Sequence, residues 1–194
     1  MPHEPKNKLD WVSINPEYLM SIYDRMVTES GAKVLFFSRL AAVEMSSDDT
    51  IDAIIVSNKA GLVAFKGKVY IDTTGDGDLA AWSGASFKRG YDEEGSIQMS
   101  SLCFSFANID SYDYINGPTL YVWKDESTPL YKAVRSGKYP LVDTHFCNNL
   151  VGPDVIQCNA GHMTVDTTDP WAISEAMILG RQKAVQYLEA MKDV

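Results

Sequence analysis

Residues 69–90 read VYIDTTGDGDLAAWSGASFKRG, and this stretch decides how the rest of the chain is interpreted. A short apolar run at residues 69–72 leads into the glycine–aspartate turn DTTGDGD of residues 72–78, and small residues of helical character follow at 79–84. The sequence therefore predicts a short buried strand, a tight turn and a helix, with the turn carrying the chemistry.

The spacing of Gly75, Gly77 and Ala80 matches the G-x-G-x-x-G/A loop that binds dinucleotides, which also lies between a strand and a helix. That loop receives a pyrophosphate on bare backbone amides. Here Asp76 and Asp78 would place two carboxylates beside the anion. Their repulsion argues against a first Rossmann loop at this position.

The same turn overlaps the first half of a calcium-binding loop, with Asp72, Thr74 and Asp76 at ligand positions and Gly77 after them. The twelfth position of such a loop is a bidentate glutamate, but here it is Ser83. A strand also precedes the turn where the calcium motif has a helix, so the pattern argues against calcium.

DTTGDGD also resembles the DTTGAGD signature of ribokinase-like sugar kinases. That resemblance implies Asp78 as the catalytic base and the turn amides as an anion hole. Asp76 stands where the signature has alanine, and a second carboxylate in an anion hole opposes phosphoryl transfer. A sugar kinase stays open as the alternative function, next to a non-enzymatic module that self-associates.

The fourth interpretation covers nearly the whole chain. Residues 69–90, then Gln98 and the strand-like SSLCFSFANID of residues 100–110, resemble FAD-dependent oxidoreductases of the fumarate-reductase-like superfamily, which carry an IDATGDGDLAA-AGA-like motif. Residues 17–45 resemble the family's helix, glycine turn and strand before its β-meander, and residues 167–191 resemble its later AE-gR helix. The order and spacing of these segments agree with that family.

The resemblance implies that FAD is the cofactor and lies beside the turn. The backbone amides of Thr74, Gly75 and Gly77 would approach its phosphate and ribityl region, where glycines permit close approach. The Asp78 carboxylate would accept a hydrogen bond from a ribityl hydroxyl. Asp76 belongs to the same cofactor-binding turn.

The resemblance also implies the reaction, a hydride transfer between a small-molecule substrate and FAD. Arg39 and Leu40, which follow the strand-like residues 34–37, would lie near the adenine. His162, just before the last predicted helix, is the one candidate for a catalytic acid or a partner in hydride transfer. A loop histidine bonded to the backbone is the simpler interpretation of the same residue.

Two features of that family are missing from the sequence. No G-x-G-x-x-G unit precedes Asn15, and the chain ends at Val194, shortly after the AE-gR-like helix. Because the G-x-G-x-x-G loop binds the ADP pyrophosphate, we expect an internal segment of a longer flavoprotein, truncated naturally or artificially. Such a segment would bind FAD weakly or not at all and would be inactive alone.

The predicted fold is α/β with α+β character: a partial Rossmann-like FAD-binding domain with an antiparallel β-meander, plus part of a substrate or cap domain. Its boundaries are 1–85 for the FAD-binding part, 86–168 for the cap part and 169–194 for a helix that packs on the first domain. The expected elements are a helix from Pro16 that stops at Gly31, buried strands at 34–37 (as in a parallel sheet) and 69–72, meander strands at 42–45, 50–57 and 62–65, a strand at 96–108, and a helix at 127–136. A last helix begins at Asp169-Pro170 or at Ser174 and runs to about Lys192.

Four side chains could in principle ligate zinc: His145, Cys147, Cys158 and His162. Their spacing does not match a zinc knuckle, so we expect no metal. On the last predicted helix, Arg181 falls on the apolar stripe and is expected to form an ion pair.

Composition limits the partners. Seventeen basic and 26 acidic side chains give a formal charge of −9, and 45% of the residues are hydrophobic. This balance indicates a globular chain that repels nucleic acids and anionic membranes.

The sequence also predicts where the protein resides. Residues 1–11 lack the apolar core of a signal peptide, and no apolar run approaches the ~18 residues of a membrane span. Three cysteines without a CxxC pair indicate a reducing cytoplasm. The expected partners are a small-molecule substrate and a second copy of the chain, docked where the missing half would lie.

Overall fold

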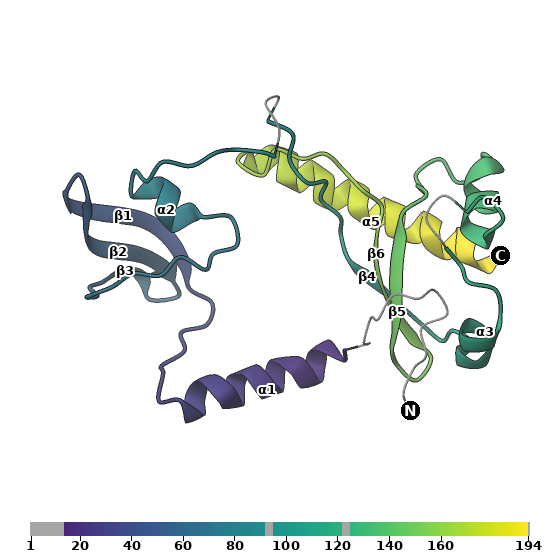
Figure 1. The fold of residues 1–194 in the computed structure, drawn as a ribbon, viewed down its shortest axis with the longest axis horizontal. Coiled ribbons are helices and arrows are strands. Elements are labelled where there is room, and N and C mark those ends of the chain that lie inside the picture. Colours follow the sequence, from purple (N-terminus) through teal and green to yellow (C-terminus); the bar gives the residue numbers. More distant parts are fainter. Residues whose placement is uncertain (1–13, 92–94, 122–124, 194) are drawn as a thin grey trace. The chain divides into compact units, whose positions relative to one another are not determined.

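The computed structural model describes residues 14–91, 95–121 and 125–193 (Figure 1). The chain forms two compact units, which are described separately. Tyr23–Ile97 form the meander unit, and Gln98–Val194 together with Met1–Ile22 form the C-terminal unit. The N-terminal residues that predict no signal peptide lie outside the described part of the chain.

The first helix, α1, spans Pro16–Glu29 and begins where the sequence predicts it. The Asn15 Oδ1 atom accepts hydrogen bonds from the backbone N–H groups of Glu17 at 3.0 Å and Tyr18 at 3.3 Å, which caps the helix. Gly31 follows the helix in the left-handed region with a φ of 82°, where glycine is unstrained. The capping and stop positions are therefore confirmed.

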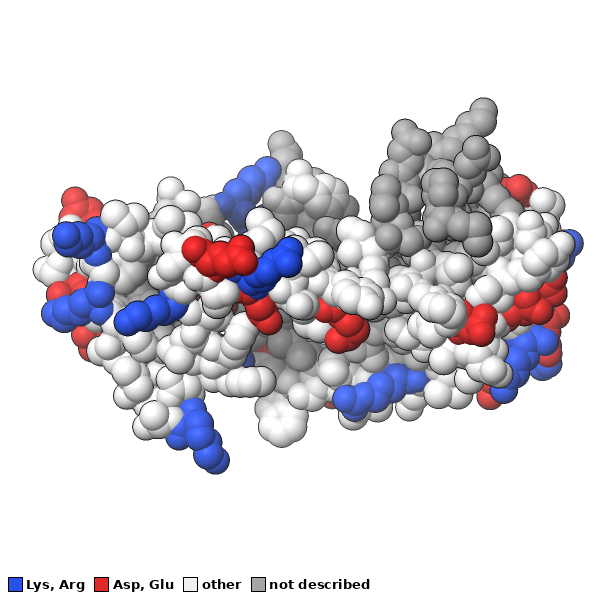
Figure 2. Space-filling model, turned by 90° about the horizontal axis from the view of Figure 1, so that it is seen from below, with Lys and Arg blue, Asp and Glu red and all other residues white. Residues whose placement is uncertain are grey.

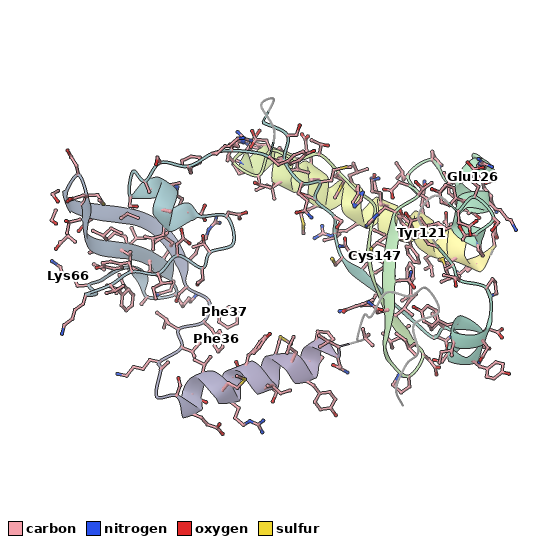
Figure 3. All side chains as sticks on the ribbon, viewed as in Figure 1. Phe36, Phe37, Lys66, Tyr121, Glu126 and Cys147 are labelled. Atoms are coloured by element: carbon pink, nitrogen blue, oxygen red, sulfur yellow. The ribbon has the colours of Figure 1, made fainter. Side chains whose placement is uncertain are left out.

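The two buried strands predicted at residues 34–37 and 69–72 are wrong. Both stretches lack strand structure, and their large apolar side chains are exposed. The exposed fractions are 63% for Phe36 and 99% for Phe37, which follow α1 in the chain and precede β1 (both labelled in Figure 3), and 77% for Val69 and 78% for Ile71. A parallel strand needs paired neighbours to be buried, and both sheets described in this chain are antiparallel. The Rossmann-like part of the prediction is therefore not confirmed, although the mixed α and β content is.

The predicted meander is confirmed. Strands β1 (Arg39–Ser47), β2 (Thr50–Asn58) and β3 (Gly61–Phe65) form an antiparallel sheet in the order β1-β2-β3. The short helix α2 (Asp78–Trp82) packs beside β1, which brings the glycine–aspartate turn to this sheet.

The C-terminal unit contains a second antiparallel sheet in the order β4-β6-β5. Its strands are β4 (Phe104–Ala107), β5 (Phe146–Gly152) and β6 (Val155–Ala160), so the predicted strand at 96–108 is shortened to four residues. The helices are α3 (Ser111–Asn116), α4 (Pro129–Arg135) and α5 (Pro170–Lys192). The Asp169 Oδ1 atom caps α5 by accepting from Trp171 N at 2.8 Å. Of the two predicted starts of this helix, Asp169-Pro170 and Ser174, the first is therefore confirmed.

The core of this unit lies between one face of the sheet and helices α4 and α5. Its largest fully buried side chains are Tyr187, Phe146, Leu130 and Ile156. At Gly180, an added Cβ atom would lie 2.7 Å from Leu102 Cβ, so the absence of a side chain lets α5 pack closely against Leu102. Arg181 is exposed, so its predicted place on the buried stripe is wrong.

The boundaries proposed after residues 85 and 168, and the packing of the last helix on the first domain, stay predictions. In the described part of the chain, no helix combines the length and apolarity that crossing a bilayer requires.

Replacing Leu130, which is fully buried, by alanine should destabilise the C-terminal unit by about 2–5 kcal/mol because it leaves a cavity in the core. Replacing Ile178, an exposed apolar residue of α5, by alanine is the matched control and should change the free energy of unfolding by about 0.5 kcal/mol or less. Urea unfolding followed by circular dichroism measures both, and equal losses would contradict this core assignment.

Candidate functional site

The glycine–aspartate turn is organised by the carboxylate of Asp72. Its Oδ1 atom accepts hydrogen bonds from Thr74 N at 2.9 Å and Thr74 Oγ1 at 2.8 Å. Its Oδ2 atom accepts from Ala80 N, in the first turn of α2, at 2.9 Å. The hydrogen bond from the Thr74 amide, followed by that from the Ala80 amide, lowers the pKa of Asp72. This side chain therefore ties the start of the turn to the helix that follows it.

The Thr74 hydroxyl carries the network into the middle of the turn. While it donates to Asp72, its oxygen accepts from Gly77 N at 3.1 Å and Asp78 N at 3.0 Å. The backbone amides of Thr74, Gly77, Asp78 and Ala80 are therefore all engaged by side chains of the turn itself.

The free carboxylates of the turn are acceptors, and the backbone amides of Gly75 and Asp76 have no acceptor among the described residues. Asp76 is exposed and Asp78 is half-buried, and neither carboxylate has a hydrogen-bond partner among the described residues. Gly75 and Gly77 have φ values of 91° and 74°, and a Cβ atom on either would meet nothing within 4 Å. These glycines therefore allow the backbone of the turn to adopt left-handed φ values without strain. The space beside them is open.

Arg39 and Leu40, which the sequence places near an adenine, begin strand β1 and pair with Ser57 and Val56. Arg39 is exposed and Leu40 is half-buried. Because α2 packs beside β1, these residues and the turn belong to the same compact unit.

A second polar centre in the C-terminal unit surrounds the carboxylate of Asp143. Its Oδ1 atom accepts from His145 N at 2.9 Å and from the Tyr187 hydroxyl at 3.0 Å. Its Oδ2 atom accepts from His162 N at 2.8 Å and lies 3.9 Å from Lys183 Nζ. Asp143 thereby fixes the two segments that carry the histidines.

The two histidine rings stack, with centroids 4.0 Å apart and an angle of 28° between their planes. Burial, with a smaller contribution from the charge of His162, lowers the pKa of His145. Cys147 Sγ lies 3.4 Å from His145 Nε2, and burial raises the pKa of this thiol. At neutral pH the uncharged imidazole of His145 therefore lies beside the protonated thiol of Cys147.

The sequence singled out His162 but missed its pairing with His145. The pattern that could have identified this centre is Asp143-x-His145-x-Cys147, because alternate residues of an extended segment lie on the same side. Cys158 lies in the core, whereas Cys147 lies on β5 (Figure 3). Within the described residues, no group of three or more His, Cys, Asp and Glu side chains is placed to hold a metal ion.

Comparison with known proteins adds one finding. A family model described as FAD dependent oxidoreductase matches residues 2–194. No curated protein and no solved structure matches the chain.

Replacing Asp72 by asparagine should loosen the turn, because an amide nitrogen cannot accept the bond from Ala80 N. At neutral pH we expect faster hydrogen exchange at the Thr74 and Ala80 amides, measured by NMR. In the unmodified chain, the Asp72 contribution is present above the pKa of an unfolded aspartate, about 3.9, and is lost as the pH falls through the lower folded value.

The control is Asp76→Asn, since Asp76 has no partner among the described residues. It should leave exchange at both amides unchanged. Identical behaviour of the two variants would contradict the role given to Asp72.

Replacing His162 by glutamine should raise the pKa of His145, because it removes a neighbouring positive charge. The value should still stay below the ordinary histidine value of about 6.5, since burial is the larger cause. Proton NMR of the His145 ring measures this titration, and Gln182→Ala, a change at an exposed position of α5, is the control. A fall in the pKa of His145 would refute the explanation.

Proposed function

The chain belongs to the FAD-dependent oxidoreductase family, and from this premise we propose that it takes part in hydride transfer between a small-molecule substrate and FAD. When bound, FAD supplies the two-electron chemistry, and the protein supplies binding, orientation and electrostatics. The proposal concerns which residues of this chain do so.

The observation that carries the proposal is the hydrogen bonding of the turn. Its amides at Thr74, Gly77, Asp78 and Ala80 already donate to Asp72 or Thr74. Only the amides of Gly75 and Asp76 are left for a phosphate, which needs free donors, and they lie beside the free carboxylates of Asp76 and Asp78. A hydroxyl group can instead donate to such a carboxylate. The turn therefore suits a ligand with hydroxyl groups, as in the ribityl chain of FAD.

Asp78 is the proposed acceptor for a ribityl hydroxyl. It is half-buried at the start of α2, so its position is more restricted than that of the exposed Asp76. Thr74, Gly75, Asp76 and Gly77 complete the cofactor-binding turn. A phosphate contact by the Thr74 and Gly77 amides would require them to leave their present acceptors.

Arg39 and Leu40 are proposed to lie near the adenine. The support is their place at the start of β1, in the same unit as the turn. The guanidinium of Arg39 is exposed and so accessible to a ligand.

His162 is proposed to hold or deliver a proton for the substrate. Its backbone is fixed by Asp143, and its ring lies against that of His145. An imidazole suits this role because its ring nitrogens can both donate and accept a proton.

A small-molecule substrate agrees with the distribution of charge. On the face drawn in Figure 2, basic and acidic side chains are intermingled, and the chain as a whole carries a formal charge of −9. Binding of a polyanion generally uses a concentrated basic surface.

The alternative of a ribokinase-like kinase has less support, because the amides of Thr74, Gly77 and Asp78 in its anion hole already have acceptors. Self-association stays a proposal, supported by exposed apolar side chains such as Phe36 and Phe37.

Titrating FAD into the purified chain tests the cofactor assignment through flavin fluorescence. We expect weak binding, and replacing Asp78 by asparagine should weaken it further by roughly tenfold, because a charge-assisted hydrogen bond is lost. Asp76→Asn is the control and should change the affinity much less.

No fluorescence change at millimolar FAD would contradict the assignment of the turn. A purified chain that already contains near-stoichiometric FAD would instead overturn the expectation of weak binding.

A further inference from the structure

The two faces of the β4-β6-β5 sheet differ in chemistry. Side chains alternate along each strand, and the face toward α5 carries the core residues Phe106, Phe146 and Ile156. The register places seven other residues on the opposite side, which we call the outer face: Ser105, Ala107, Cys147, Asn149, Val155, Gln157 and Asn159.

The outer face contains no ionised side chain. Strands β4, β5 and β6 read FSFA, FCNNLVG and VIQCNA, without any lysine, arginine, aspartate or glutamate. Such residues make up 22% of the chain, and strands β1 and β2 include Arg39, Glu44 and Asp52. Ser105, Gln157 and Asn159 are exposed, and exposed positions are where charged residues are ordinarily most frequent.

The outer face instead presents free amides. Asn149 and Gln157 are paired across adjacent strands, and Ser105 continues this row on β4. Neither amide side chain has a hydrogen-bond partner within the described residues. Asn159 Oδ1 accepts from Ser101 Oγ, which leaves the Asn159 amino group to donate elsewhere. Each primary amide offers two donors and an acceptor.

The histidine pair lies at one end of this face. His145 precedes Cys147 by two residues, so the alternation puts it on the same side, and its ring stacks on His162. A neutral imidazole offers one donor and one acceptor. The ring of Tyr121, which packs against the core, meets His145 edge-on with centroids 6.3 Å apart.

We propose that the outer face, with the His145–His162 pair at its end, binds an uncharged, hydroxyl-rich small molecule of the sugar class. The strands of this face carry no lysine or arginine to pair with an anion and no aspartate or glutamate to pair with a cation. An apolar ligand would bury the amides of Asn149 and Gln157 without partners, which is costly. Hydroxyl groups, which both donate and accept, match amides and imidazoles.

The proposal does not depend on FAD binding, because all of its residues belong to the C-terminal unit and the FAD-binding turn belongs to the meander unit. If the proposed oxidoreductase function holds, a sugar would be the substrate class. Sugar titration and FAD titration therefore report on different residues and can fail separately.

The test is a titration of the full ¹⁵N-labelled chain with three related pyranoses, namely uncharged D-glucose, anionic D-glucuronate and cationic D-glucosamine. We expect glucose to shift the side-chain amide resonances of Asn149 and Gln157 and to bind more tightly than either charged sugar. Replacing Asn149 or Gln157 by alanine should weaken glucose binding roughly three- to tenfold, since each loses its hydrogen bonds.

Gln182→Ala is the matched control, because Gln182 is an exposed amide on α5; it should leave glucose binding unchanged. Gln157→Ala and Ser105→Ala lie at exposed positions, so they remain informative even if Asn149→Ala disturbs the sheet. The proposal is overturned if glucose shifts neither side-chain amide, if the alanine variants bind it as the unmodified chain does, or if a charged sugar binds more tightly.

Discussion

The C-terminal unit depends on Tyr187, whose ring packs in the apolar core and whose hydroxyl binds a carboxylate. Its fully buried ring stacks on Phe146 with centroids 5.5 Å apart, and its hydroxyl donates to Asp143 at 3.0 Å. Burial, and then the Asp143 charge, raise the pKa of Tyr187, so the hydroxyl keeps its proton. One side chain thus joins the apolar core to the carboxylate that fixes both histidine segments. The packing of α5 and the placement of the histidine pair are therefore coupled.

In both units, a carboxylate holds loop segments in place by hydrogen bonds to their backbone. Asp72 accepts hydrogen bonds from the backbone N–H groups of Thr74 and Ala80. Asp143 accepts them from the backbone N–H groups of His145 and His162. Such bonds satisfy backbone donors that a helix or sheet would otherwise use. The free polar groups are then displayed on a defined backbone in the absence of any ligand.

The sequence predicted the features that a few neighbouring residues determine. Asn15 and Asp169 cap their helices, and the polar turns of the meander separate its strands. The apolar residues 34–37 and 69–72 misled the prediction, because an apolar run indicates a tendency to be buried but does not supply a partner strand. The histidine pair was missed for a related reason: 17 positions separate His145 from His162, and only folding brings them together.

Strand β5 has a further consequence, because it lies at the edge of its sheet with β6 on one side. Edge strands are commonly protected against pairing with other chains by charges or prolines. The segment FCNNLVG has neither. In concentrated solution, the open backbone of β5 would serve as a template for strand addition, and its adjacent asparagines would favour stacked amide ladders. The absence of charge that suits this sheet to a neutral ligand therefore also leaves β5 unprotected against aggregation.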